Sequence, residues 1–304
     1  MSKAFVFTQY GGAEVQQMVD MPLPTPGPGQ LLVAVRAAGV NPIDWKVRAG
    51  YLQQMMPVEL PAVLGCAAAG VVQAIGEGVD GFSVGDEVFA ALPLVGAYAE
   101  YALFPAAGTV AKPAGISFEI AATLPVAAAA AYDGIEQVAL KEGQTLLVLG
   151  AGGGVGAPAV QLARARGIRV LGVASAGKQE LVQSLGGIFV LSGEGVEERI
   201  REISPDGVDA VFDLVGGETV RALAGLAHDS SRVVSAADYA IAEIGGAALE
   251  HPDAVATLRA LGELAEAGTL TPQITATFSL DDAGAALALV EEGHVSGKVV
   301  ITVS

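Results

Sequence analysis

The sequence predicts an α/β protein with two parts, a β-rich, partly closed barrel and a doubly wound parallel sheet. Short β-like runs separated by Pro and Gly turns fill the first third of the chain, which is typical of a small barrel. From Phe118 onward, long Ala/Leu segments alternate with apolar runs, as in right-handed βαβ units. The 304 residues are 52% hydrophobic and 16% charged, which fits a large buried core and excludes a disordered chain.

Each expected strand is a short apolar run bounded by turn residues. In the barrel part these runs are Ala4–Phe7, Gln30–Ala38, Gly70–Ile75, Glu87–Ala90 and Ala97–Phe104. In the parallel-sheet part they are Thr145–Leu149, Arg169–Val173, Phe189–Leu191, Val208–Val215 and Arg232–Ala236. The tail adds a helical pattern, Leu280–Glu292, and a last β-run over 297–303 that resembles the barrel strands and could return to them.

The composition excludes several classes of partner. There are 33 acidic and 16 basic residues, and the net charge of −17 disfavours nucleic acid and anionic membranes. The single cysteine, Cys66, excludes an intramolecular disulfide and indicates a reducing compartment. The first residues lack the apolar core of a signal peptide, and the Ala-rich stretch Ile120–Tyr132 is too short to span a bilayer. We therefore expect a cytoplasmic protein.

The most informative segment is a strand, turn and helix pattern over 145–167. An apolar run ends in a glycine cluster and a helical pattern follows directly, which is the context that a dinucleotide fingerprint requires. Glycines allow a tight turn and the close approach of a pyrophosphate to the helix N-terminus. A purely structural turn also uses glycine, but this context favours a cofactor. The expected cofactor-binding residues here are Gly150, Ala151, Gly152, Gly153, Gly154, Val155 and Gly156.

The end of the next expected strand indicates which nucleotide is bound. An NAD-binding protein would place Asp or Glu there, against the ribose 2′-hydroxyl. This chain has Ser175 at that place, and Lys178 follows within reach. A hydroxyl and an ammonium attract a 2′-phosphate, which a carboxylate would repel. The sequence therefore favours NADP(H), although Lys178 could instead only solvate the start of a helix.

These segments resemble the medium-chain dehydrogenase/reductase superfamily, and within it the zinc-free quinone oxidoreductases related to zeta-crystallin. Besides the glycine turn, the matching segments are Ala38–Tyr51, Leu64–Val72, Val84–Val88, Gly96–Tyr101, Val208–Gly217 and Gly293–Val300. The resemblance implies a GroES-like catalytic domain of residues 1–118, completed by 267–304. It also implies a Rossmann domain that binds NADP at residues 119–266.

The resemblance also bears on metal binding. Zinc-dependent relatives place a ligand Cys where this chain has Asn41, and a Gly-His-Glu where it has Gly65-Cys66-Ala67. A catalytic zinc needs three protein ligands, and Asn41 and Ala67 cannot complete a soft site. We therefore expect no metal, and Cys66 is expected to be a small buried residue. Without a Lewis acid, oxidation of a simple alcohol is disfavoured.

What remains is hydride transfer from NADPH to an acceptor activated by conjugation, either a quinone or an α,β-unsaturated carbonyl. The resemblance implies a catalytic cleft lined by Asn41, Asp44, Lys46 and Tyr51. Asn41 is expected to donate to a carbonyl oxygen, and Tyr51 to donate to a developing oxyanion. Alternatively, Asp44 caps the following helix, and Lys46 and Tyr51 are ordinary surface residues. Further cofactor contacts are implied at Val215, Ser235, Ala236 and Lys298.

Two rival functions stay open, an enoyl reductase because the same architecture reduces activated double bonds on carriers, and a non-catalytic protein because this chain departs from the family pattern at Ala67, Ala130 and Ser192. One is an enoyl reductase acting on acyl thioesters, for which Lys46 and Arg48 would have to receive an acyl carrier. The other is a non-catalytic NADPH-binding sensor. The resemblance further predicts a homodimer through an edge strand at Arg232–Ala236 and the segment Gly245–Leu249 after it.

Overall fold

The computed structural model describes residues 1–293 and 295–304, and these residues form two compact units. Unit 1 comprises Met1–Val126, Ala254–Glu266 and Ile274–Ser304, and unit 2 comprises Ala127–Asp253 and Ala267–Gln273. Unit 1 is β-rich and unit 2 alternates strands with helices, which confirms the predicted α/β fold class. His294, inside the matching segment Gly293–Val300, lies outside the described residues.

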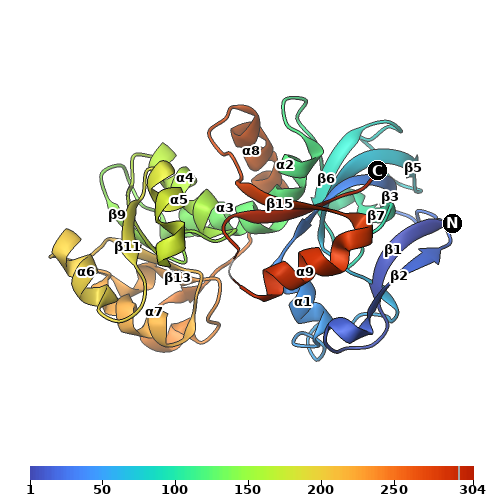
Figure 1. Cartoon of the computed structure of the whole chain (residues 1–304). Coiled ribbons are helices and arrows are strands. Elements are labelled where there is room, and N and C mark those ends of the chain that lie inside the picture. The colour runs from blue at the N-terminus through green and yellow to red at the C-terminus, as the bar shows by residue number, and fades with distance from the viewer. Residues whose placement is uncertain (294) are drawn as a thin grey trace. The chain divides into compact units, whose positions relative to one another are not determined.

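Unit 1 contains a seven-stranded sheet and a three-stranded sheet (Figure 1). The large sheet has the order β15-β16-β3-β5-β6-β8, with β7 also paired to β3, and the small one has the order β2-β1-β4. The strands are β1 (Ser2–Phe7), β2 (Gln16–Met21), β3 (Gln30–Val40), β4 (Ala62–Val63), β5 (Ala67–Ile75), β6 (Glu87–Ala91), β7 (Tyr101–Pro105), β8 (Thr109–Ala111), β15 (Ile274–Ser279) and β16 (Lys298–Thr302). The helices are α1 (Pro42–Arg48), α2 (Phe118–Thr123), α8 (Ala254–Glu266) and α9 (Ala283–Glu291).

The tail of the chain completes unit 1, as its last β-run indicated. Strand β16 pairs antiparallel with β3 and parallel with β15. Helix α9 lies beside α1 (Figure 1). Helix α8, which we expected in the nucleotide domain, belongs to unit 1 because Leu258 and Leu261 are buried there and Glu266 accepts the N–H of Gly115 at 2.9 Å.

Unit 2 is a parallel sheet with the order β11-β10-β9-β12-β13-β14. The strands are β9 (Thr145–Leu149), β10 (Arg169–Ala174), β11 (Ile188–Leu191), β12 (Ala210–Asp213), β13 (Val233–Ser235) and β14 (Ala247–Ala248). The helices are α3 (Ala129–Val138), α4 (Gly156–Ala165), α5 (Gln179–Ser184), α6 (Val196–Ile203) and α7 (Gly217–Leu223). In Figure 1, α3, α4 and α5 lie on one face of this sheet and α6 and α7 on the other.

Apolar residues on both faces of β9 explain its central place in this sheet. Leu147 and Leu149 pack in one core cluster with Ile200 of α6 and Val220 of α7. Such runs, apolar on both faces, are typical of strands covered by helices on each side. The expected edge strand at 232–236 is wrong, because β13 lies between β12 and β14, and the two-residue β14 forms the edge.

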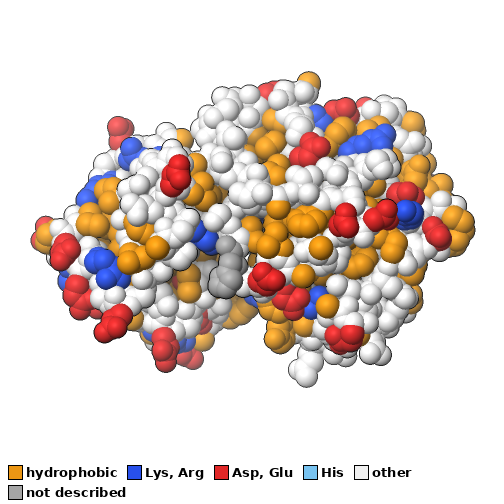
Figure 2. Space-filling view, viewed as in Figure 1, with side chains coloured by type: hydrophobic (Ala, Val, Ile, Leu, Met, Phe, Trp, Pro, Cys, Tyr) orange, Lys and Arg blue, Asp and Glu red, His pale blue; other side chains and the backbone are white. Residues whose placement is uncertain are grey.

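The surface reflects the acidic composition. Asp and Glu side chains are spread over the visible face of each unit in Figure 2. Among the described helices, none has the length and apolar character needed to cross a membrane.

Candidate functional site

The glycine turn between β9 and α4 is fixed by the neighbouring strand. Gly150 has a φ of +87°, and the N–H groups of Gly150 and Ala151 both donate to the carbonyl of Val173 in β10, each at 3.0 Å. A Cβ at Gly156 would lie 2.2 Å from the Gly150 oxygen. Only glycine fits where the chain turns into α4.

The turn carries unused hydrogen-bond donors. Four backbone N–H groups donate to no acceptor in the part of the chain that the structure describes, those of Gly152, Gly154, Val155 and Gly156. They lie at the start of α4, a ten-residue helix whose N-terminal end carries a partial positive charge. Donors gathered at a helix N-terminus bind phosphate oxygens, so these residues fit the pyrophosphate of a dinucleotide.

Lys178 lies against this turn. A Cβ at Gly152 would be 2.6 Å from Cδ of Lys178, so the lysine chain packs over the glycine backbone. Partial burial lowers the pKa of Lys178. Ser175 is exposed just after β10, and its carbonyl accepts the N–H of Lys178 at 2.9 Å. The structure therefore brings the turn, Ser175 and Lys178 together, and their role in binding NADP(H) stays a prediction.

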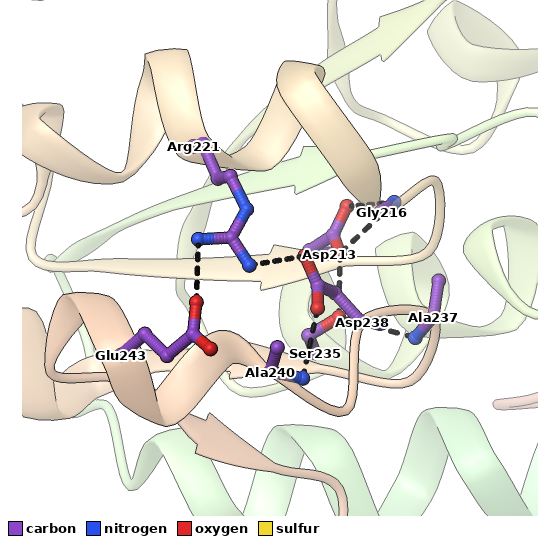
Figure 3. A network of polar contacts seen from close by, with 8 residues as sticks. All are labelled: Asp213, Gly216, Arg221, Ser235, Ala237, Asp238, Ala240 and Glu243. Carbon is purple, nitrogen blue, oxygen red and sulfur yellow. Dashed lines mark hydrogen bonds and ion pairs between the residues drawn. The ribbon is translucent and has the colours of Figure 1, made fainter.

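A second polar network stands at the ends of β12 and β13 (Figure 3). The buried carboxylate of Asp213 accepts the N–H groups of Val215 and Gly216 at 3.0 Å and the hydroxyl of Ser235 at 2.6 Å. The Ser235 oxygen in turn accepts the N–H of Asp238 at 2.8 Å. The buried hydroxyl of Ser235 holds the two loops together, and the expected contact of Ser235 with the cofactor stays a prediction.

Arg221 of α7 ties the second of these loops in place. Its guanidinium lies 3.5 Å from the Asp238 carboxylate and 3.3 Å from that of Glu243 (Figure 3). Val215 and Ala236 are exposed just beyond β12 and β13, so they remain candidates for cofactor contact. Asp213 was not expected from the sequence, although a carboxylate within the apolar run Val208–Val215 was a usable signal.

Asn41 and Lys298 form the centre of a buried polar cluster in unit 1. Asn41 follows β3, and Lys298 opens β16, which pairs with β3. Lys298 is 4% exposed. Its ammonium donates to Asn41 Oδ1 at 2.6 Å and to the Val40 carbonyl at 2.8 Å. The Asn41 amide also donates to the Gly39 carbonyl at 3.0 Å. The Lys298 ammonium therefore binds Val40 and Asn41, and its expected contact with the cofactor stays a prediction.

Asp44 adds a carboxylate to this cluster. Its Oδ2 accepts the N–H of Asn41 and the hydroxyl of Tyr98, each at 2.7 Å, so it does cap α1. Its Oδ1 is buried and accepts no hydrogen bond of good geometry from any described residue, although the Cys66 thiol lies beside the carboxyl. Burial raises the pKa of Asp44 to about 6 and lowers the pKa of Lys298 to about 8.

The two other expected catalytic residues lie apart from this cluster, on the exposed side of α1 and just after it. Tyr51 is 69% exposed, and its ring meets that of Trp45 edge-on with centroids 5.7 Å apart. The Lys46 ammonium lies 5.9 Å from the centre of the same Trp45 ring. The structure thus separates the four expected residues into a buried pair and an exposed pair. Tyr98 was not expected from the sequence as a partner of Asp44.

Two protein-family models match this chain, one over part of unit 1 and one over part of unit 2 and the tail. A family model described as an alcohol dehydrogenase GroES-like domain matches residues 27–114. A second model, described as a zinc-binding dehydrogenase, matches residues 189–301.

Similar proteins extend over nearly the whole chain. The 2-methylene-furan-3-one reductase of Solanum lycopersicum is 33% identical over 98% of this chain and 78% of its own length. The chloroplastic NADPH-dependent alkenal/one oxidoreductase of Arabidopsis thaliana is 31% identical over 98% and 79%. The solved structure of the quinone oxidoreductase from Coxiella burnetii is 31% identical, with a TM-score of 0.91 and coverage of 100% and 99%. The chain therefore belongs to the medium-chain dehydrogenase/reductase superfamily and is an oxidoreductase of its quinone oxidoreductase family.

Proposed function

We propose that this enzyme transfers a hydride from NADPH to a quinone or an α,β-unsaturated carbonyl, and that it does so without zinc. The observation that carries the proposal is the buried Lys298 ammonium, which occupies the polar cluster beside Asn41 and Cys66. The names of the similar reductases support the acceptor class.

The residues of this chain do not fit a zinc ion. No group of three or more His, Cys, Asp or Glu residues able to hold a metal occurs in the described part of the chain. A catalytic zinc needs three such ligands, and a cation already lies beside Asn41. Without a Lewis acid to activate an alcohol, the favoured acceptor is one whose own conjugation prepares it for hydride.

The residues do fit a dinucleotide. The backbone donors of the glycine turn would hold the pyrophosphate, and Lys178 with Ser175 would hold the 2′-phosphate that distinguishes NADPH from NADH. When bound, the nicotinamide supplies the hydride. The Asp213 network would keep the neighbouring strand ends, with exposed Val215 and Ala236, in one conformation.

On the acceptor side, we assign the role of hydrogen-bond donor to Tyr51. Its hydroxyl is exposed, whereas Asn41 is buried and both ends of its amide already bind protein atoms. A phenol stabilises negative charge as it develops on the acceptor oxygen. Asn41 and Asp44 would then serve to position the start of α1, and Lys46 would add a positive charge near Tyr51.

The rival functions receive less support. Arg48, one of two basic residues that could receive an acyl carrier, is buried, and its guanidinium lies 2.9 Å from the Glu291 carboxylate. Lys46 alone offers too little positive charge to bind an acyl carrier protein. The non-catalytic alternative conflicts with the oxidoreductase relatives.

We also propose a homodimer that uses the β14 edge of the unit 2 sheet, since an uncovered sheet edge favours pairing with another chain. The buried, unpaired Cys66 supports a reducing compartment, for which we propose the cytoplasm.

The function is tested by NADPH oxidation with a panel of quinones, enones and enoyl thioesters, with and without a chelator. We expect turnover with the first two classes that is insensitive to the chelator. Tyr51→Phe should lower turnover several-fold, and more for enones than for quinones, because hydroquinone anions are less basic and need less stabilisation. Tyr101→Phe, a change in β7, is the matched control. Loss of activity in the chelator, or activity with thioesters alone, would contradict the proposal.

A further inference from the structure

The segment 51–60, which follows α1 in unit 1, gathers exposed apolar side chains. Eleven large hydrophobic side chains are exposed in the described part of the chain, and four of them belong to this segment. They are Tyr51 at 69%, Met55 at 71%, Met56 at 50% and Leu60 at 38% exposure. A single exposed hydrophobic side chain is ordinary, whereas a group of them marks a binding surface.

The segment is anchored on its inner side, so the exposed side chains are not needed to hold it. The Tyr51 N–H donates to the Lys46 carbonyl at 3.0 Å where α1 ends. The Val58 N–H donates to the Tyr10 hydroxyl at 3.2 Å. Leu52 and Val58 pack against the hydrophobic core of unit 1. The inner residues therefore fix the backbone, and the outer ones are left for a ligand.

A turn of the backbone keeps the two methionines close to Tyr51. The N–H groups of Met55 and Met56 both donate to the Leu52 carbonyl, at 3.1 and 2.8 Å. Methionine is unbranched and polarizable, so it adapts to apolar groups of different shapes. Tyr51 is also the residue to which we assign the hydrogen bond with the acceptor oxygen. One short turn thus combines a polar donor with an adaptable apolar surface.

We propose that the segment 51–60 is the subsite for an alkyl chain of the acceptor, and that Met55 and Met56 set the preference for it. The enzyme then favours enones and quinones with an alkyl substituent over small polar ones. Each methylene removed from water adds favourable free energy in proportion to its area, so the preference grows with chain length. This inference rests on the proposed function, because it takes Tyr51 as the donor to the acceptor.

Two other occupants of this surface receive less support. The net charge of −17 disfavours an anionic membrane, and Glu59 is exposed within the segment itself. The dimer that we propose uses β14 of unit 2, which places a second copy of the chain on another surface. A small apolar ligand needs neither a neutral membrane nor a second interface.

A homologous series of acceptors tests the subsite. NADPH oxidation is measured with alkyl vinyl ketones from methyl to hexyl, in which the enone is constant and only the alkyl chain grows. The slope of log kcat/KM against the number of methylenes is compared between the native chain and the double variant Met55→Ser with Met56→Ser. The matched control is Leu23→Ser with Val84→Ser, since these residues of unit 1 are 50% and 63% exposed and lie outside the segment. Circular dichroism verifies folding.

We expect kcat/KM of the native chain to rise by about twofold per methylene, because a chain bound on a surface is only partly removed from water. The slope should fall by at least half in the methionine variant and stay native in the control. A flat series in the native chain would overturn the subsite and leave the proposed function intact, whereas no turnover with any ketone would count against the proposed function.

The same variants are tested for the other occupants by flotation with neutral phosphatidylcholine vesicles and by light scattering. A native slope in the methionine variant would overturn the alkyl subsite. Loss of vesicle binding or of the dimer in that variant, with the slope unchanged, would overturn it in favour of a membrane or a second copy of the chain.

Discussion

Two lysines show how burial changes the use of the same side chain. Lys178 is partly buried where its chain crosses Gly152, beside the backbone donors of the glycine turn. Lys298 was expected at the cofactor too, but its ammonium is buried and bound to Val40 and Asn41. The lysine that we propose to bind the 2′-phosphate is Lys178, which packs over Gly152 of the glycine turn.

The role of Lys178 is open to a direct measurement. Lys178→Ala removes a charge-assisted contact to the 2′-phosphate, so the Kd of NADPH should rise by about tenfold or more, that is about 1.5–3 kcal/mol before solvent screening. The Kd of NADH should change little, because NADH lacks that phosphate. Titration calorimetry with both nucleotides measures this, and Lys141→Ala, an exposed lysine before β9, is the control. Equal weakening of both nucleotides would show that Lys178 does not recognise the 2′-phosphate.

At the scale of elements, the start of α1 is joined to β3 and β16 by one buried cluster. Asp44 of α1 caps its own helix and binds Tyr98, which lies between β6 and β7, while Lys298 of β16 holds Asn41. Burial raises the pKa of Asp44 from 3.8 to about 6 and lowers the pKa of Lys298 from 10.5 to about 8. Both shifts mean that the charged forms are disfavoured by folding.

These shifts predict a pH dependence of stability with a definite sign. From pH 3.8 to about 6 the folded chain holds a proton on Asp44 that the unfolded chain has released, so this group makes stability fall as pH rises. From about pH 8 to 10.5 the unfolded chain holds a proton on Lys298 that the folded chain has lost, so the contribution of Lys298 to stability rises with pH. Burial raises the pKa of the Cys66 thiol, so above the ordinary thiol pKa that group contributes with the opposite sign.

Urea unfolding at a series of pH values tests the Lys298 part. Subtracting the curve of Lys298→Met from that of the native chain cancels the titrating groups that do not interact with Lys298, and adding Cys66→Ala to both chains removes the coupled thiol. The difference should rise with pH between about 8 and 10.5, and the exposed control Lys141→Met should show no such difference. Equal slopes for the native chain and Lys298→Met would mean that folding does not disfavour this ammonium.

The sequence predicted elements with strong local signals and missed those that depend on distant partners. The apolar run and glycines around β9 predicted the cofactor turn, because both signals lie within a few neighbouring residues. Strand β15 was missed because its residues alternate between exposed and half-buried and its pairing partner lies beyond α9. The Tyr98–Asp44 bond joins residues 54 positions apart, and no pattern along the chain encodes it. A lysine before the apolar run of β16 was a usable sign of the buried ammonium.

At the scale of the whole chain, residues near the two ends bind one another within unit 1. Lys298 of the tail binds Asn41, and Arg48 of α1 binds Glu291 of α9, so the tail supplies partners for residues near the N-terminus. Unit 1 is for this reason a discontinuous unit, and α8 belongs to it although the sequence pattern of alternating strands and helices continues through that helix. Composition alone gives no boundary there, since α8 is as rich in Ala and Leu as the helices of unit 2.

We predict that two copies of the chain form a dimer through β14, the edge strand of the unit 2 sheet. Gln137 of α3 binds the Ala248 carbonyl at 2.9 Å and the Glu250 N–H at 3.0 Å, so pairing with a second chain would use the remaining backbone groups of this edge. We expect a dimer of two 30.5 kDa chains in light scattering at micromolar concentration. Ala248→Arg places a charge on the edge and should shift the dimer toward monomer, because charged residues block edge pairing. Ala222→Arg, an exposed position in α7, should leave the dimer intact. A native monomer would contradict the dimer, and an Ala248→Arg dimer as stable as the native one would place the contact away from β14.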